Sequence, residues 1–383
     1  MRVLHVNKRY PPHVGGIERH LRELAQAQAR LPGVTVDVVV VAEGPPGIDQ
    51  DGPVRVRRVA EWGTVASNPV SLDVARVLAA SAADREHDVW HFHYPFPTGE
   101  LSLLWRRVLG RPCPVTVCGY HSDFVSQSSA KRALSAPYSL ATRTFLDTVD
   151  AVIAASPQLA QHSRFLPRVS SKVHVIPYGI DPAPFRSTPE VEEAARGLRE
   201  RYGSPVTLFV GRLVPYKGVE VLVRALPYVP GVLVVVGDGP LRRSLQALAH
   251  SLGVAERTHF VGPLGQEELN HHFHAADVMA LPSITPNEAF GLVQLEAHAC
   301  GVPVVSTDLP TGVPFANQHG ETGLVVAPGD VAELAAALGL LLEDEGLRCE
   351  MGERARARLL ARFTVERMTD QVLGLYRELL ERR

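Results

Sequence analysis

Residues Asn287–Ser306, NEAFGLVQLEAHACGVPVVS, form the most specific stretch of the chain. A helix is expected to start near Phe290, and Gly291 lets a ligand approach the helix start, where unpaired N–H groups suit a phosphate or sugar oxygen. With a rise of ~1.5 Å per residue, Glu296 lies roughly 8–9 Å along this helix. Glu288 and Glu296 are therefore spaced to hold the two ends of one elongated ligand. The plainer interpretation is a buried helix with one capping and one surface glutamate.

Two cations precede this stretch, at the end of an expected strand. Gly211-Arg212 follow the apolar run 206–210, and Lys217-Gly218 stand at the start of the next helix. At the carboxyl edge of a parallel sheet, an arginine fork and a lysine point charge five residues apart can converge on a diphosphate. On their own they would equally suit two solvated surface positions.

Two further motifs lie near strand ends in the first half of the chain. Gly15-Gly16, in PPHVGGIERH, allow the backbone to approach a phosphate, although a plain tight turn would use them equally well. They do not form the G-x-G-x-x-G pattern of dinucleotide-binding enzymes. His121, in CGYHSDF, directly follows an expected strand, and Asp123 is expected to orient its ring. The alternative for His121 is a structural histidine.

Short β-branched runs alternate with helical patterns along the chain, which indicates βαβ units and a parallel sheet covered on both faces. The expected strands of the first half are 3–6, 35–41, 54–59, 88–92, 115–118, 151–155 and 172–176, with helices over 17–30, 70–82, 131–146 and 157–165. The proline-rich segment 177–189 is then expected to be a linker. Beyond it, strands are expected over 206–210, 232–236, 259–261, 278–281 and 302–306, and helices over 218–226, 241–252, 266–275, 291–300, 331–342, 347–363 and 365–380. We predict an α/β protein of two Rossmann-like doubly wound domains, 1–180 and 190–363, that face each other across a ligand cleft.

The composition is that of an ordinary globular protein, with 45% hydrophobic and 21% charged residues among 383. Lys and Arg number 39 against 41 Asp and Glu, which argues against a nucleic-acid binder. Four cysteines without a Cys-x-x-Cys pair, an N-terminus unlike a signal peptide and the lack of an apolar run of roughly 20 residues favour a cytoplasmic protein. The segment 101–110, LSLLWRRVLG, is expected to be an ordinary core helix, and the alternative is a peripheral contact with the inner face of a membrane.

Taken together, these motifs resemble the retaining glycosyltransferases of family 4, which have the GT-B fold. The resemblance spans nearly the whole chain, through VGGIE (14–18), PYGID (177–181), GRLVPYKG (211–218), VVGDGP (235–240) and the 287–306 stretch. The opening LHVNKRYPPHVGGIE and the YHSDF segment are further similar to bacterial mannosyl- and rhamnosyltransferases of cell-surface polysaccharide assembly. One departure is that the usual Glu-Gly-Phe-Gly reads Glu288-Ala289-Phe290-Gly291. Alanine adopts fewer backbone angles than glycine, so this sugar-binding loop is expected to be set slightly differently.

The resemblance implies a catalytic set of His121, Arg212, Lys217 and Glu288. Arg212 and Lys217 would hold the donor diphosphate and offset the charge that develops on the leaving group. Glu288 would hold the hexose and the distal phosphate, together with backbone N–H groups of Phe290, Gly291, Leu292 and Val293.

The remaining donor contacts that the resemblance implies come from both halves of the chain. Glu296 would hold the ribose hydroxyls, His121 would contact the transferred sugar, and Gly15 and Gly16 would close over the phosphates. The final helix, 365–383, would pack back on the N-terminal domain.

The resemblance also implies a hexosyltransferase that needs neither a cofactor nor a divalent ion, in line with the lack of an Asp-x-Asp motif near either site. The donor would be a nucleotide sugar, with GDP-mannose favoured and a UDP-sugar next. The acceptor hydroxyl would belong to a glycan, a lipid-linked molecule or a small molecule. Retention would follow from attack on the same face as the leaving group, with a donor phosphate oxygen taking the acceptor proton.

Other classes of protein share this architecture. A sugar-nucleotide epimerase would need further acid/base carboxylates around the sugar, and a phosphorylase would usually carry pyridoxal phosphate on a lysine. A non-catalytic sugar-nucleotide-binding subunit is the third alternative, which the intact set of Arg212, Lys217, Glu288 and Glu296 disfavours. Donor hydrolysis and product analysis distinguish all three.

Overall fold

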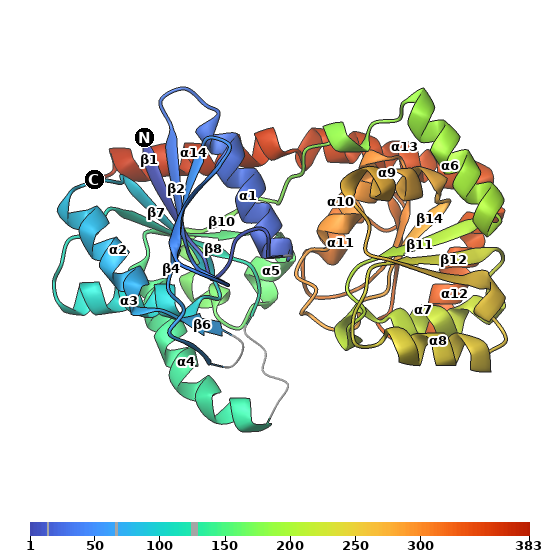
Figure 1. The fold of residues 1–383 in the computed structure, drawn as a ribbon, viewed down its shortest axis with the longest axis horizontal. Coiled ribbons are helices and arrows are strands. Elements are labelled where there is room, and N and C mark those ends of the chain that lie inside the picture. The colour runs from blue at the N-terminus through green and yellow to red at the C-terminus, as the bar shows by residue number, and fades with distance from the viewer. Residues whose placement is uncertain (14, 66–67, 124–128) are drawn as a thin grey trace. The chain divides into compact units, whose positions relative to one another are not determined.

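The computed structural model describes residues 1–13, 15–65, 68–123 and 129–383 (Figure 1). It divides the chain into two compact units. The first domain comprises Met1–Gly179 together with Val365–Arg383, and the second domain comprises Ile180–Thr364.

The first domain is built on an eight-stranded sheet with the order β10-β9-β8-β7-β1-β2-β4-β3. Its strands are β1 (Arg2–Val6), β2 (Thr35–Val41), β3 (Gly47–Asp51), β4 (Val54–Val59), β7 (Val89–Tyr94), β8 (Val115–Tyr120), β9 (Ala151–Ala154) and β10 (Val173–Val175). Neighbouring strands are parallel except the hairpin β3–β4, and β5 (Gly63–Val65) with β6 (Asn68–Val70) forms a separate antiparallel ribbon. Because the order reverses on either side of β1, a topological switch point lies between β1 and β7.

The helices of this domain include the last helix of the chain. They are α1 (Gly16–Ala29), α2 (Leu72–Ala83), α3 (Pro97–Val108), α4 (Ser129–Thr148), α5 (Pro157–His162), the 3-10 segment η1 (Leu166–Lys172) and α14 (Val365–Glu381). Met368, Val372 and Tyr376 of α14 are buried in one apolar core with Leu21 and Leu24 of α1. The C-terminal helix is thus part of the first domain.

The second domain has a six-stranded, fully parallel sheet with the order β13-β12-β11-β14-β15-β16. Its strands are β11 (Val206–Val210), β12 (Val232–Val236), β13 (Thr258–Gly262), β14 (Val278–Leu281), β15 (Val304–Thr307) and β16 (Gly323–Val326). This is the 3-2-1-4-5-6 order of a Rossmann fold, with the switch point between β11 and β14. The prediction of two Rossmann-like doubly wound domains is confirmed.

Helices cover both faces of the second sheet (Figure 1). They are α6 (Pro189–Tyr202), α7 (Val219–Ala225), α8 (Arg242–Ser251), α9 (Gln266–Ala275), α10 (Leu292–Ala299), α11 (Val313–Ala316), α12 (Val331–Glu343) and α13 (Glu345–Arg362), with 3-10 turns at 183–185, 215–217, 226–228 and 255–257. Because both faces are covered, a strand such as β12, VLVVV, is buried at every position.

Candidate functional site

The switch point of the second domain places the expected site residues on two neighbouring strands. Arg212 and Lys217 follow β11, while Ser283 and Glu288 follow β14, which pairs with β11 in parallel. Ligands of open α/β sheets bind at the carboxyl ends of the strands, at this kind of position. Residues 71 positions apart in the sequence therefore meet at one edge of the sheet.

Lys217 and Glu288 form an ion pair with each other, and the Ser283 hydroxyl donates to the same Glu288 oxygen at 3.0 Å. Both charged side chains are largely buried, with 13% and 9% of their surface exposed. Burial disfavours the ammonium ion, but the charge of Glu288, the nearby Tyr216 and the hydrogen bond to Glu288 together outweigh it, and the pKa of Lys217 is raised. The two buried charges of the pair therefore compensate each other.

The lysine loop is fixed against the segment that follows β14. The Ile284 amide donates to the Tyr216 carbonyl at 2.8 Å. Gly218 has φ +66°, and a Cβ at this position would lie 1.9 Å from the Pro282 carbonyl oxygen. Only glycine fits here, both because of the left-handed backbone and because of the close approach.

Arg212 differs from Lys217 in being exposed. It makes no ion pair with any residue that the structure describes. The guanidinium is therefore an uncompensated positive charge at the carboxyl end of β11, free to take a bidentate anion.

The glutamate helix, α10, starts at Leu292, two residues later than expected. The reason is Gly291, which caps the helix with φ +73° and leaves the amides of Leu292 and Val293 in the first turn, where N–H groups lack helical acceptors. Gln294 closes the turn by donating its side-chain amide to the Phe290 carbonyl at 2.8 Å. Anion binding at the start of α10 stays a prediction.

Ala289 takes the place of the family's glycine without backbone strain. Among the described residues, the only non-glycine with a positive φ is Arg85, so Ala289 lies in an ordinary region. Its carbonyl accepts from the Gly312 amide at 2.7 Å, and Phe290 is buried beside it. The expected disturbance of this loop by alanine has no basis in its backbone conformation.

Glu296 lies one turn further along α10 and is 2% exposed. A side chain that contacts ribose hydroxyls is expected at the accessible edge of the site, and Glu296 is more buried than that. Its role at the ribose stays a prediction.

In the first domain, Gly15 and Gly16 start α1 directly after the loop that leaves β1. A Cβ at Gly15 would lie 2.1 Å from a carboxylate oxygen of Glu18, whereas at Gly16 it would meet nothing within 4 Å. Packing against Glu18 therefore accounts for glycine at position 15, whereas position 16 has room for a larger side chain. Val14 of the VGGIE motif lies outside the described residues.

His121 follows β8 and is buried, with both ring nitrogens engaged. Its Nε2 bonds His93 Nδ1 at 2.9 Å and its Nδ1 bonds the Tyr178 hydroxyl. The expectation that Asp123 orients this ring is wrong, because the Asp123 carboxylate instead bonds the Tyr120 and Ser163 hydroxyls and the Arg164 amide. Phe124 of the CGYHSDF segment lies outside the described residues.

Sequence reasoning did not single out Ser283 or Tyr178. A signal for Ser283 is its place just after β14, the same position that Arg212 has after β11. Tyr178 belongs to the PYGID motif, but its contact with His121 depends on β10 and β8 lying in one sheet.

Two doubly wound α/β domains, one with cations, a carboxylate and a glycine-started helix at its switch point, define a protein of the nucleotide-binding class. Comparison with known proteins identifies the class further. Residues 14–184 match the model of Glycosyltransferase Family 4, and residues 190–358 match that of Glycosyl transferases group 1. The chain belongs to glycosyltransferase family 4 and has the GT-B architecture.

Curated relatives match along the full length of the chain. O-antigen chain mannosyltransferase C of Escherichia coli is 33% identical, with 100% of this chain and 99% of the relative covered. The D-rhamnosyltransferase WbpZ of Pseudomonas aeruginosa is 35% identical, with 95% and 92% covered. A GDP-mannose-dependent phosphatidylinositol monomannoside mannosyltransferase of Mycolicibacterium smegmatis is 33% identical, with 92% of both chains covered.

Solved structures share the fold. A sucrose-phosphate synthase from Thermosynechococcus elongatus has a TM-score of 0.81 at 26% identity and covers 100% of both chains. HepE of Anabaena, in complex with UDP, has a TM-score of 0.77 at 23% identity and covers 99% of this chain and 100% of its own. The chain is thus a glycosyltransferase with mannosyl- and rhamnosyltransferase relatives.

Proposed function

We propose that this glycosyltransferase moves a hexose from a GDP-linked donor of the GDP-mannose type to an acceptor hydroxyl, with retention of configuration and without a metal ion. The observation that carries the proposal is the arrangement at the β11–β14 switch point. The exposed Arg212 lies near a Lys217–Glu288 pair in a site of nucleotide-binding geometry. The choice of sugar is supported by relatives named as mannosyltransferases, one of them as GDP-mannose-dependent. A UDP-sugar is the next candidate.

In the proposal, different residues of the second domain bind different parts of the donor. Arg212 and Lys217 hold the diphosphate and balance the charge that grows on it as the sugar leaves. The donor phosphate competes with Glu288 for Lys217, which frees the Glu288 carboxylate to accept hexose hydroxyls. The start of α10 offers N–H groups to the distal phosphate. Glu296 is assigned to the ribose, and His121, Gly15 and Gly16 keep their predicted contacts with sugar and phosphates.

Retention requires that the new bond form on the face that the diphosphate leaves. In the proposed step the acceptor oxygen bonds to the anomeric carbon as the carbon–oxygen bond to the donor phosphate breaks. The proton of the acceptor hydroxyl passes to a phosphate oxygen of the departing nucleotide. Nuclear magnetic resonance of the product tests this step, and an anomeric configuration opposite to that of the donor contradicts it.

Donor choice and metal independence are tested together. A thermal-shift screen with GDP, UDP, ADP and dTDP is expected to give the largest increase in Tm with GDP. Turnover of GDP-mannose is expected to survive EDTA, since the groups of three potential metal ligands among the described residues all belong to the first domain, whereas Arg212 and Lys217 belong to the second. A loss of activity that Mg²⁺ or Mn²⁺ restores, or a preference for UDP, contradicts that part of the proposal. Hydrolysis or epimerisation of the donor as the sole reaction points to the other enzyme classes.

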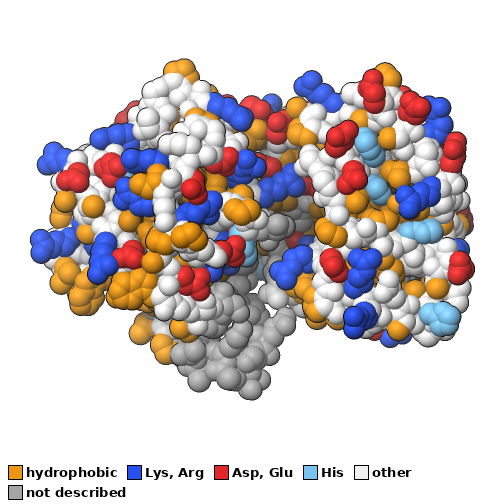
Figure 2. Space-filling model, in the orientation of Figure 1, with side chains coloured by type: hydrophobic (Ala, Val, Ile, Leu, Met, Phe, Trp, Pro, Cys, Tyr) orange, Lys and Arg blue, Asp and Glu red, His pale blue; other side chains and the backbone are white. Residues whose placement is uncertain are grey.

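The first domain carries an exposed apolar surface that bears on peripheral membrane contact. Leu101, Trp105 and Val108 of α3 are 51%, 64% and 79% exposed, and Leu109 after α3 and Leu140 of α4 are also exposed. Figure 2 shows apolar side chains gathered on the lower part of the first domain, over α2 and α3. The expectation of an ordinary core helix over 101–110 is wrong for this face, because α3 buries Gly99, Glu100, Ser102 and Leu103 instead.

We extend the proposal to a peripheral contact of this face with an anionic lipid surface, where a lipid-linked acceptor would lie. Aromatic and aliphatic side chains next to the exposed cations Arg111 and Arg143 suit such a surface. No helix in the described residues has the length and hydropathy to span a bilayer. Sedimentation with vesicles of anionic lipid is expected to fall for Trp105→Ser and to stay unchanged for Leu360→Ser, an exposed leucine of the second domain. Equal sedimentation of both variants with the wild type contradicts the contact.

A further inference from the structure

Five histidines are buried together in the first domain. They are His5 on β1, His20 on α1, His91 and His93 on β7, and His121 after β8. Burial lowers the pKa of His5 to about 4 and of His20 to about 3, and it holds the pKa of the other three well below the ordinary value. The rings are therefore neutral at neutral pH, and each has one N–H donor and one acceptor nitrogen.

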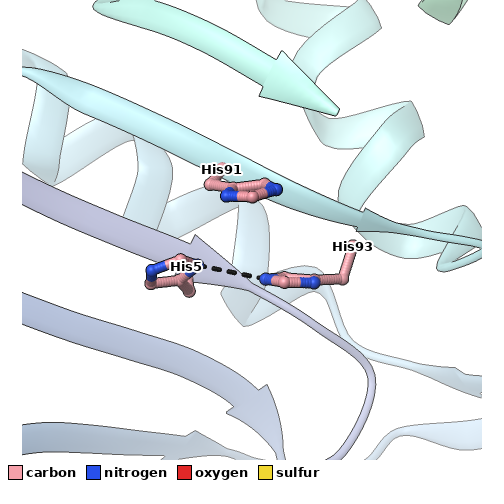
Figure 3. A group of neighbouring side chains, drawn as sticks. All are labelled: His5, His91 and His93. Atoms are coloured by element: carbon pink, nitrogen blue, oxygen red, sulfur yellow. Dashed lines mark hydrogen bonds between the residues drawn. The ribbon is translucent and has the colours of Figure 1, made fainter. Parts of the chain in front are cut away.

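Three of these rings form one continuous hydrogen-bonded chain between Gln28 and Tyr178. His5 Nε2 bonds the Gln28 Oε1 at 2.8 Å, and His5 Nδ1 bonds His93 Nε2 at 3.0 Å. His93 Nδ1 then bonds His121 Nε2 at 2.9 Å, and His121 Nδ1 bonds the Tyr178 hydroxyl. Figure 3 shows the bond between His5 and His93, while the His91 ring lies over the pair and takes no part in it. We call the five hydrogen-bonded residues Gln28, His5, His93, His121 and Tyr178 the imidazole chain.

The imidazole chain crosses the switch point between β1 and β7 and continues to the end of β8. Gly119 of β8 leaves room for the His91 ring that lies over the chain, because a Cβ there would lie 2.7 Å from His91 Nε2, whereas its 3.6 Å distances to His93 Nδ1 and His121 Nε2 would be ordinary contacts. The chain thus connects the last turn of α1 with the carboxyl edge of the sheet, where His121 lies.

A neutral imidazole that accepts a hydrogen bond at one nitrogen must donate one at the other. The donor and acceptor of one hydrogen bond therefore fix the donor and acceptor of every other bond in the chain. The Gln28 oxygen can only accept, which places the proton of His5 on Nε2. His5 Nδ1 must then accept from His93 Nε2, and His93 Nδ1 must accept from His121 Nε2. His121 is left with its lone pair on Nδ1, where the Tyr178 hydroxyl donates.

A metal site is the competing explanation, since ligand atoms of His5, His91 and His93 lie within 4.8 Å of one another, as do those of His20, His93 and His121. Their geometry does not suit it. The His91 and His93 rings are within 13° of parallel at 4.5 Å, so their in-plane lone pairs do not converge on one point. The facing nitrogens of His5 and His93 already bond each other, and this set includes no carboxylate to balance a buried divalent charge. In the second set, the His93 and His121 rings are within 5° of parallel and their facing nitrogens already bond each other.

We propose that Gln28, His5 and His93 are positioning residues that hold His121 in its Nε2–H form, so that the one position it can offer a ligand is the acceptor Nδ1. A sugar hydroxyl binds there by replacing the Tyr178 hydroxyl as donor. The ring therefore selects a hexose that carries a hydroxyl group on the carbon facing His121 Nδ1, and it disfavours a sugar that is deoxy at that carbon. The role of His121 at the sugar rests on the proposed function, whereas its tautomer does not.

Nitrogen-15 NMR of histidine-labelled full-length protein tests the tautomer without any substrate. Wild type is expected to show His5, His93 and His121 protonated at Nε2. Gln28→Leu removes the acceptor and is expected to abolish this single pattern at His121, while Gln28→Glu retains an acceptor oxygen and preserves it. Gln26→Leu, the same substitution two residues earlier on α1 and outside the chain, is the matched control and is expected to leave it unchanged.

Protonation of His121 at Nδ1 in the wild type overturns the proposal, and so does an unchanged Nε2–H pattern in Gln28→Leu. If Gln28→Leu does not fold, His5→Phe breaks the chain at its second member. This variant is likewise expected to abolish the single Nε2–H pattern at His121. Added Zn²⁺ that shifts the His5, His91 and His93 signals at one equivalent would establish the metal site instead. With the donor identified, Gln28→Leu is expected to lower kcat more than it changes KM, and Gln28→Glu to restore kcat. A normal tautomer pattern without transferase activity would count against the proposed function alone.

Discussion

The ammonium group of Lys217 is paired with the carboxylate of Glu288, 71 residues later in the chain. The sequence predicts that both residues bind the donor, but not that they bind each other. Their pairing depends on β11 and β14 being neighbours at the switch point. It means that Lys217 has a structural role in the folded domain besides its proposed contact with the donor, whereas the exposed Arg212 does not share this structural role.

Arg212→Ala is therefore expected to lower kcat by about 10²–10³, the usual cost of one preorganised contact to a charge that develops in the transition state. The Tm is expected to stay near that of the wild type, because the side chain is exposed and makes no ion pair with the described residues. Initial rates with the donor and scanning calorimetry measure the two effects. Near-normal activity of a normally folded Arg212→Ala variant would remove Arg212 from the site.

Lys217→Ala is expected to lower both activity and stability. It leaves the Glu288 carboxylate buried with only the Ser283 hydroxyl, and breaking a buried pair on one side typically costs about 3–5 kcal/mol. In the double variant Lys217→Met/Glu288→Gln no charge remains unpaired, so much of the lost Tm is expected to return while activity stays low. Equal melting of Lys217→Ala and wild type would mean that the pair does not persist in solution.

Gly218→Ala tests the close approach that holds the lysine loop. The new Cβ would overlap the Pro282 carbonyl oxygen at 1.9 Å in a backbone region that alanine avoids, so a loss of roughly 1–3 kcal/mol in the free energy of unfolding is expected. Gly16→Ala is the matched control, because a Cβ there meets open space. Urea denaturation of the two variants compares them directly. A similar loss in both would show that the contact with Pro282 is not the cause.

Much of the second domain could be predicted because its parallel strands are buried on both faces and read as short valine-rich runs. The segment 278–281 is a strand over the predicted residues, and 266–275 is a helix over the predicted residues. The sequence prediction lacks helix α6, because it assigns Pro189 to the end of the linker. Proline suits the first position of a helix, and here Thr188 caps α6 before it.

The imidazole chain and the outer face of α3 could not be predicted from local pattern. The histidines of the imidazole chain lie at positions 5, 93 and 121, and only the strand order β8-β7-β1 brings them together. On α3, the spacing of Leu101, Trp105 and Val108 predicts an apolar stripe, but not which way the stripe faces. The opposite face is buried although it carries Glu100 and Ser102, because Glu100 finds partners inside the domain.

Glu100 is a buried carboxyl in the first domain, 1% exposed. Burial raises its pKa to about 7 from 4.5, although the Phe96 amide at 2.8 Å and the Tyr138 hydroxyl at 2.9 Å stabilise the charged form and limit the rise. A raised pKa in the folded state means that the unfolded chain loses this proton first as the pH increases. The stability that the protonated carboxyl contributes is therefore complete below pH 4.5 and is lost as the pH rises through about 7.

The wild type is accordingly expected to lose about 3 kcal/mol relative to Glu100→Gln between pH 4.5 and pH 8, since the glutamine stays neutral at every pH. All three tryptophans, Trp62, Trp90 and Trp105, belong to the first domain, so denaturation followed by tryptophan fluorescence reports on that domain alone. Glu193→Gln, at an exposed position of the second domain, serves as the control. Its free energy of unfolding should change with pH in the same way as that of the wild type. Stability curves for Glu100→Gln and wild type that stay parallel across this range would show that Glu100 ionises normally in the folded protein.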